Sequence, residues 1–203
     1  MVDENTFRTL LQARDYDAAL TLTIRSYGSE LLGWMEAQLR DQNRAREAFT
    51  WFAEDLWNSL RAFRGECSAR TWAYAVARNS VNRYRARGQV APYEAVNLSA
   101  ISRASVLMVA PLTPDSREAT DRRLQLIERL RGELTEEDQA LLTLRIDKGL
   151  QWREGAIVLR YEGNLPDEDE LTREEARLRK RFQLVKERLR KLALETSEEP
   201  GTR

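Results

Sequence analysis

The residues best suited to chemistry are arginines interleaved with aromatic side chains between Ala62 and Asn79. This string reads AFRGECSARTWAYAVARN and contains one glycine, Gly65. Guanidinium groups bind phosphates and aromatic faces stack on unpaired bases, so an exposed loop beside a basic helix can hold a base outside the stack. The pattern therefore indicates nucleic-acid binding. For Trp72 the alternative is a place in the core, because its spacing from Val76 also suits burial.

Charge is segregated along the chain, although 33 basic and 33 acidic residues cancel overall. Residues 58–88 carry seven arginines against one glutamate, and residues 176–192 carry eight basic residues against one acid. Residues 30–57 hold six acids and three arginines, and 167–170 is an unbroken acidic run. Two basic and two acidic blocks suit a phosphate-contacting protein with a separate protein-binding face.

The composition excludes the common catalytic sites. The chain has no histidine, which excludes Ser-His-Asp triads, His-activated cysteines and ordinary zinc catalysis. The single cysteine, Cys67, cannot close an internal disulfide, which fits a reducing compartment. Residues 1–11 lack the apolar run of a signal peptide, and the longest apolar stretch, 106–112, is too short to span a bilayer. We expect a cytoplasmic protein that is not an enzyme and needs no cofactor or metal.

The elements that position these residues are expected to be helices. Nine glycines and five prolines are few for the turns of an all-β chain. Apolar residues recur every three or four positions over 16–39, over 45–60 and from about Arg70 to Gly88, and the short first connection makes its two helices antiparallel. Residues 63–67 read as a loop, with Ser68 as the N-cap of the third helix.

A second helical module is expected after a linker over 89–116, which has no sustained period and contains three prolines. Periodicity resumes at about Arg117. Thr135 with Asp138 forms a capping box for a helix through Ile146, and Gly149 ends it. A short helix over 151–160 and a long final helix, opened by a capping box at Thr172 and ending in a frayed tail after residue 195, complete an all-α chain.

The 62–79 string resembles the FRGESSxRTWLYxIARN string of region 2 in extracytoplasmic-function sigma factors, small members of the sigma-70 family that direct RNA polymerase to promoters. Twelve positions agree with that string: Phe63, Arg64, Gly65, Glu66, Ser68, Arg70, Thr71, Trp72, Tyr74, Ala77, Arg78 and Asn79. The resemblance implies that this loop captures a flipped base of the minus-10 element as the duplex melts. The implied minus-10 residues are Arg64, Gly65, Glu66, Ser68, Arg70, Thr71, Trp72, Arg78, Asn79 and Arg83.

The helix over 45–57 corresponds, in the same resemblance, to the one that docks on a coiled coil of the polymerase β′ subunit. Family members carry Gln followed by an acid at the positions of Thr50 and Trp51, so the chain departs from the pattern there. The candidate polymerase contacts are Glu47, Trp51, Glu54, Asp55 and Trp57, and the alternative for each is a solvated helix face. An exposed Trp51 would be a natural interface anchor.

The C-terminal module resembles region 4, whose helix-turn-helix reads the minus-35 element. Residues 134–145 and 149–154 follow its LPxxxRxxLxLRxxxGLSxxEI pattern, and residues 178–190 resemble the VRKRxxRAxxRLR of its recognition helix. The candidate minus-35 residues are Arg173, Arg177, Arg179, Lys180, Arg181, Gln183 and Lys186. The turn over 161–171 is unusually long and acidic, so it must point away from DNA or alter DNA reading. The alternative for the last helix is a coiled-coil-like segment with a charged face.

The resemblance covers residues 15–88 and 117–192 in the order and spacing of the family. It implies a region 2 three-helix bundle over 1–88, a linker over 89–116 and a region 4 helix-turn-helix over 117–203. The implied partners are core RNA polymerase, through its β′ and β subunits, promoter DNA and an anti-sigma factor, with no membrane insertion. Two alternatives stay open: a stand-alone helix-turn-helix regulator, and a diverged sigma-like scaffold that sequesters partners.

Overall fold

The computed structural model describes residues 3–87 and 134–198, with side chains described up to residue 191. The expected linker over 89–116, the periodic segment from Arg117 and the expected helix end at Gly88 lie outside the described residues.

The regular structure of these described ranges is entirely helical, which confirms the expected all-α class. None of their helices combines the length and apolar character needed to cross a bilayer. The elements are α1 (Glu4–Gln12), α2 (Tyr16–Leu39), α3 (Gln42–Leu60), α4 (Ala69–Ala86), α7 (Glu136–Leu142), the π-helix η2 (Thr143–Asp147), α8 (Trp152–Arg160) and α9 (Glu168–Glu198).

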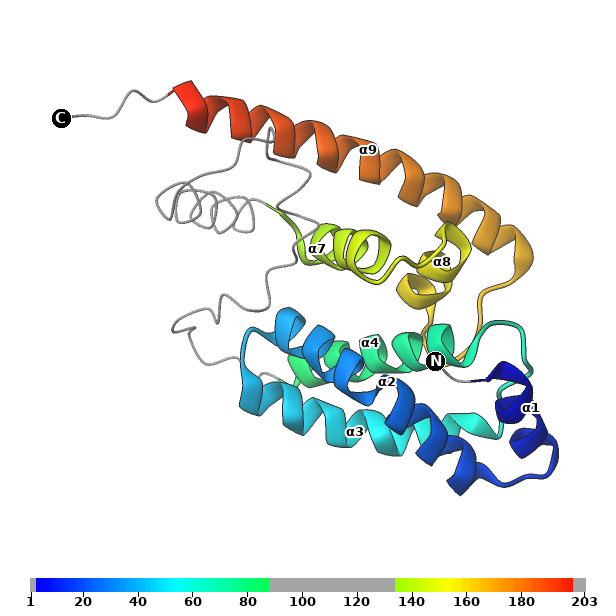
Figure 1. Ribbon diagram of the computed structural model, residues 1–203. Helices are drawn as coiled ribbons and strands as arrows, with labels where there is room; N and C mark the ends of the chain where they lie inside the picture. Colours follow the sequence, from blue (N-terminus) through cyan, green and yellow to red (C-terminus); the bar gives the residue numbers. More distant parts are fainter. Residues whose placement is uncertain (1–2, 88–133, 199–203) are drawn as a thin grey trace. The chain divides into compact units, whose positions relative to one another are not determined.

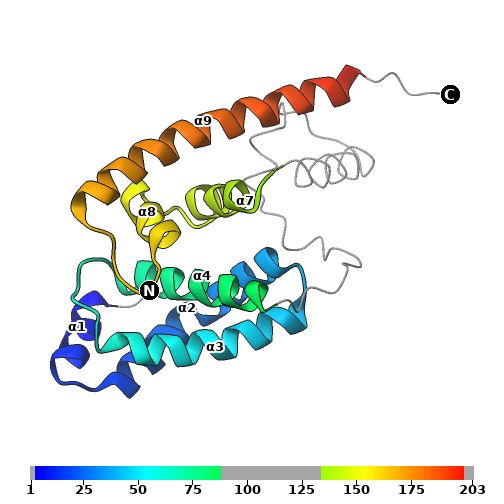
Figure 2. The same cartoon turned by 180° about the vertical axis from the view of Figure 1, so that it is seen from behind.

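The chain divides into two compact units. The first contains α1–α4 together with residues 153–171, and the second contains α7, η2, Trp152 and the part of α9 from Thr172 onward. In the first unit, α2, α3 and α4 lie side by side (Figure 1, Figure 2).

The apolar stripes predicted for α2 and α3 form the core of the first unit. Leu31 and Met35 on α2 and Phe52 and Leu56 on α3 are fully buried. Arg40 ends α2 in the left-handed conformation, at φ 55°, and the carboxylate of Asp41 accepts a hydrogen bond of 2.9 Å from the Arg44 amide at the start of α3. This tight connection explains why the two helices pair directly.

The loop and N-cap before α4 are confirmed. Gly65 adopts φ +78°, a conformation that costs glycine little and other residues more. The hydroxyl of Ser68 accepts a hydrogen bond of 3.1 Å from the Thr71 amide and thereby caps α4. The carboxylate of Glu4 also accepts from the Ala69 amide, at 3.1 and 3.2 Å.

Helix α1 was not expected from the sequence. Asp3 caps it by accepting hydrogen bonds from the Asn5 and Thr6 amides, and Phe7 is 1% exposed and packs on Phe63 with ring centroids 5.7 Å apart. The signals were present in the sequence: a capping aspartate followed by an apolar residue at the first position of a short i, i+3, i+4 stripe.

The start predicted for α9, at Thr172, is wrong. The helix begins at Glu168, because Asp167 and Glu170 form a reciprocal cap: the Glu170 amide donates to Asp167 at 2.8 Å and the Asp167 amide donates to Glu170 at 3.1 Å. Most of the acidic run therefore lies in the first helical turn, where negative charge is favoured by the helix dipole. At the other end, α9 continues to Glu198, past the expected fraying point.

Thr135 is the N-cap of α7, as expected, and Asp138 is bonded to its hydroxyl rather than to its amide. The Asp138 amide donates to the Thr135 hydroxyl at 3.2 Å, and this hydroxyl donates to the Asp138 carboxylate at 2.8 Å. The helix then widens into η2, which continues to Asp147. Gly149 follows with φ +66°, in agreement with its expected role as a helix terminator.

Candidate functional site

The loop before α4 presents charged side chains to solvent. Arg64 and Glu66 are exposed on either side of Gly65, and Cys67 is partly buried. Burial and the nearby carboxylates of Glu4, Glu66 and Glu154 raise the pKa of the Cys67 thiol to about 12. The loop therefore offers one accessible guanidinium, while its thiol stays protonated.

Trp72 is a core residue, the alternative that its spacing allowed. It is 3% exposed, its indole N–H donates to the Ser59 hydroxyl at 3.2 Å, and its ring packs on Phe63 at 5.0 Å. Within the same unit its ring also contacts Tyr161, at 5.1 Å. Trp72 thus packs against the loop through Phe63. A stacking contact between Trp72 and a base would require its ring to be exposed.

Two other predicted minus-10 residues also have protein partners. The hydroxyl of Thr71, buried next to Trp72, donates to Glu154 at 2.9 Å within the first unit. The guanidinium of Arg70 pairs with Glu30, which also accepts from the hydroxyl of Tyr74 at 2.9 Å. Burial and the adjacent Glu30 charge raise the pKa of Tyr74, so this tyrosine stays neutral. These contacts join α4 to α2 and α8.

Predicted polymerase-binding residues on α3 lie against a predicted minus-10 residue on α4. The Asp55 carboxylate accepts from the Ser80 hydroxyl at 2.8 Å and from the Arg83 guanidinium at 2.7 Å. Glu47 accepts from the hydroxyl of Tyr84 at 2.8 Å, and burial together with this hydrogen bond raises the pKa of Tyr84 to about 12. Both carboxylates are thus used inside the first unit.

Trp51 lies between these two acids along α3 and is half-buried against residues at the end of α4. Its ring is 5.3 Å from that of Tyr84, and the guanidinium groups of Arg83 and Arg87 lie 5.4 and 4.5 Å from its centroid. An arginine over an indole face is a favourable cation–π contact. We call Glu47, Trp51, Asp55, Arg83 and Tyr84 the α3–α4 cluster.

The remaining predicted residues of the first unit lie outside this cluster. Glu54 is exposed on α3. Trp57 contacts α2 instead, because its indole N–H donates to Asp17 at 2.8 Å and Arg61 lies 5.3 Å above its ring. Arg78 and Asn79 are half-buried on α4.

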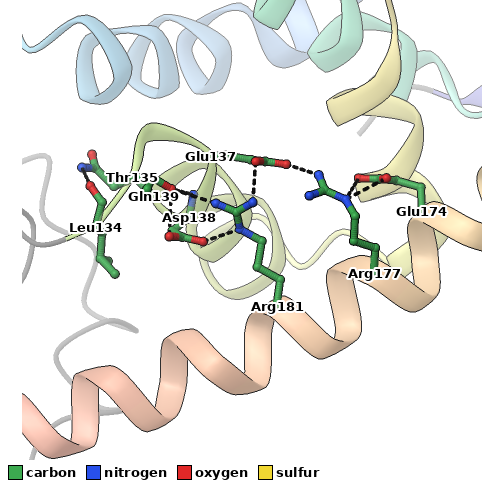
Figure 3. A network of polar contacts seen from close by, with 8 residues as sticks. All are labelled: Leu134, Thr135, Glu137, Asp138, Gln139, Glu174, Arg177 and Arg181. Carbon is green, nitrogen blue, oxygen red and sulfur yellow. Dashed lines mark hydrogen bonds and ion pairs between the residues drawn. The ribbon is translucent and has the colours of Figure 1, made fainter.

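In the second unit, two predicted minus-35 residues are occupied by an ionic network between α9 and α7 (Figure 3). Arg181 donates to Asp138 at 2.5 Å, to Glu137 at 2.6 Å and to the Thr135 hydroxyl at 2.9 Å. Arg177 pairs with Glu137 and with Glu174. Both arginine side chains therefore point toward α7, as Figure 3 shows. We call Thr135, Glu137, Asp138, Glu174, Arg177 and Arg181 the α7–α9 network.

The α7–α9 network changes the protonation equilibria of its members. Burial alone would raise the pKa of the Asp138 carboxyl, but hydrogen bonds from Arg181 and Thr135 outweigh it and hold that pKa below its ordinary value. The hydrogen bond to Asp138 in turn raises the pKa of Arg181. Each partner thus stabilises the charged form of the other.

Other predicted residues of α9 are more accessible. Arg173, Lys180 and Gln183 are exposed. Arg179 pairs with Glu175 one turn earlier and lies 6.0 Å from the Trp152 ring, and Lys186 lies 5.1 Å from the Phe182 ring. Next to them is Leu184, which is 57% exposed and which the sequence analysis did not select. The sequence did contain a sign of its exposure, because Leu184 directly precedes Val185 and so lies outside the buried stripe of this basic helix.

Part of the acidic run at the start of α9 is also neutralised. Within the first unit, the guanidinium of Arg153 donates to both carboxylate oxygens of Glu168, at 2.6 and 2.5 Å, and this hydrogen bonding lowers the pKa of Glu168. The acids at 167–170 thus act as a helix cap and an ion-pair partner.

Comparison with known proteins does not assign a family. No protein-family model matches the chain, and a search of curated proteins found no match. The function therefore has to be inferred from the residues and from the geometry described above.

Proposed function

We propose that this protein is a sigma factor of the extracytoplasmic-function type, a transcription initiation factor without catalysis of its own. In this proposal the helices of residues 1–88 bind core RNA polymerase. The loop before α4 captures an unstacked base during promoter opening, and α9 binds duplex DNA upstream. An anti-sigma factor would hold the protein inactive, as the resemblance implies.

The observation that carries the proposal is the 62–79 string together with the geometry that it adopts. Its first arginine, Arg64, is exposed in a loop that turns at Gly65 with φ +78° and leads directly into a capped basic helix. A flipped base needs a backbone that approaches closely and a cation for the flanking phosphate. The loop supplies both, and the aromatic core beneath it, Phe63 and Trp72, supports its shape.

Polymerase docking is assigned to the exposed face of α3. Among the five candidates, Glu54 is the acid that is exposed and outside the α3–α4 cluster. An exposed charge contributes to association through long-range attraction and remains available to a basic partner surface. The internal pairing of Glu47 and Asp55 is the observation that favours the second candidate function, a sigma-like scaffold that no longer drives transcription.

The proposal is tested first by binding the full chain to core RNA polymerase. Glu54→Lys is expected to weaken binding by about tenfold at low salt and by less at high salt, because screening reduces the contribution of surface charges. Glu187→Lys, a charge reversal at an exposed position of α9, is the matched control and should leave the affinity unchanged. Equal effects of the two reversals would mean that the docking face is misassigned.

Promoter opening tests the role of the loop. Arg64→Ala should reduce the permanganate reactivity of promoter thymines while core affinity stays unchanged, and Arg25→Ala, at an exposed position of α2, is the control. On a pre-melted bubble the Arg64→Ala defect should shrink only in part, because base capture is still impaired. Normal opening by Arg64→Ala, combined with normal core binding, would favour the scaffold function.

A further inference from the structure

One apolar residue of α9 lies away from the buried side of the helix. Leu178, Phe182, Val185 and Leu189 are buried and form the core side of the helix. Leu184 lies on the opposite side, is 57% exposed, and is the one large apolar side chain exposed in the part of the chain whose side chains the structure describes. Because Leu184 occupies no core position, its apolar side chain can contact a partner.

The neighbours of Leu184 are polar and accessible. Lys180 lies one turn before it and Gln183 is adjacent, and both are exposed. Arg177 and Arg181 are directed to α7 by the α7–α9 network, so they contribute less to this face. The surface that α9 offers around its middle is therefore formed by Lys180, Gln183 and Leu184, which we call the α9 outer triad, and the exposed Glu187 and Arg188 lie one turn after it.

The charge along α9 changes sign before this triad. Residues 168–175 contain five acids and one arginine, whereas residues 179–191 contain seven basic residues and one glutamate. A polyanion is repelled by the first segment and attracted by the second. A single leucine among lysine, glutamine and glutamate does not form the continuous apolar stripe that a helical protein partner would need.

The chemistry of this triad matches base edges in the major groove, which is wide enough to admit an α-helix. There, thymine presents an apolar C5 methyl group, adenine binds the side-chain amide of glutamine, and guanine or phosphate accepts from lysine. We propose that Leu184 contacts a thymine methyl group and thereby selects a T·A pair, while Lys180 and Gln183 bind neighbouring groups. The inference rests on the duplex-binding role of α9 in the proposed function.

Replacing thymine by deoxyuridine tests the contact, because it removes the methyl group alone. The full chain, free and bound to core polymerase, is used to select duplexes from a randomised library, and each thymine of the selected duplex is then replaced in turn. One replacement should weaken binding by about fourfold, the value for burying one methyl group at about 0.8 kcal/mol. In Leu184→Ala the same replacement should have no effect, whereas Gln183→Ala should retain it.

Each outcome decides between the assignments. Undiminished binding to every deoxyuridine duplex, or no binding to any duplex, overturns the contact. If deoxyuridine has no effect while core binding and promoter-dependent transcription are normal, the proposed function stands without this inference. If one methyl group matters but core polymerase is not bound, the contact stands and the protein is a stand-alone regulator. Self-association that Leu184→Ala abolishes, with no methyl effect, would assign the residue to a second copy of the chain.

Discussion

Arg181→Met should destabilise the second unit, because its guanidinium joins α9 to α7. The side chains of Arg181 and Asp138 are 25% and 10% exposed, so removing the arginine leaves a mostly buried carboxylate with one remaining partner, Thr135. Hydrogen bonds to charged groups contribute about 1.5–3 kcal/mol, which gives an expected loss of about 2–3 kcal/mol in the free energy of unfolding. Arg179→Met is the matched control: its partner lies one turn away on the same helix, its side chain is 52% exposed, and its expected loss is about 0.3–0.5 kcal/mol.

The assay is urea denaturation followed by circular dichroism, with hydrogen exchange of the α7 amides to locate the change. The effect should depend on pH. The pKa of Asp138 is lowered in the folded protein, so its stabilisation is present above the ordinary value of 3.8 and is lost as the pH falls through the folded pKa. The difference between the wild type and Arg181→Met should therefore shrink in acid. Equal losses for the two variants, or a loss independent of pH, would refute the assignment of Arg181 to the α7–α9 network.

Two further predictions concern the first unit. Gly33→Ala should raise the free energy of unfolding by about 0.5–1 kcal/mol, since Gly33 is exposed within α2 and a Cβ there meets no atom within 4 Å. Gly28→Ala is the control: its Cβ would lie 3.3 Å from Ile24, so its gain in the free energy of unfolding should be smaller. Equal gains for the two variants would contradict the packing at Gly28. Cys67 should react with iodoacetamide at pH 8 at least about tenfold more slowly in the folded than in the urea-unfolded chain, because burial raises its pKa to about 12 and lowers the thiolate fraction. A similar rate in both states would show that the thiol is not buried as described.

Much of the fold could be predicted from the sequence because its determinants are local. The stripes of α2 and α3, the cap at Ser68, the N-cap at Thr135 and the left-handed glycines at 65 and 149 each depend on a few neighbouring residues. The misplaced start of α9 was a competition between two local signals. Asp167 with Glu170 and Thr172 with Glu175 both fit a capping pattern, and the first is the one that the helix uses.

The candidate sites were less predictable because they depend on contacts between distant segments. A basic block indicates phosphate binding when it is read alone, yet Arg181 reaches back 43 residues to Asp138, and Arg83 reaches 28 residues to Asp55. Periodicity could not decide whether Trp72 is buried, because a helix with aromatic residues on several faces fits either position. The exposure of Leu184 was not predicted, because a leucine can be assigned to the surface only when the buried side of its helix is known.

The most direct test of the sigma-factor proposal is run-off transcription with core RNA polymerase and genomic fragments as templates. Core polymerase alone should give no defined transcripts, and addition of the full chain should produce discrete transcripts whose start sites share upstream sequence elements. Arg64→Ala should reduce these transcripts from duplex templates, while Arg25→Ala should not. If the chain binds core polymerase and yields no defined transcript from any fragment, it is not an initiation factor, and the scaffold function replaces the proposal.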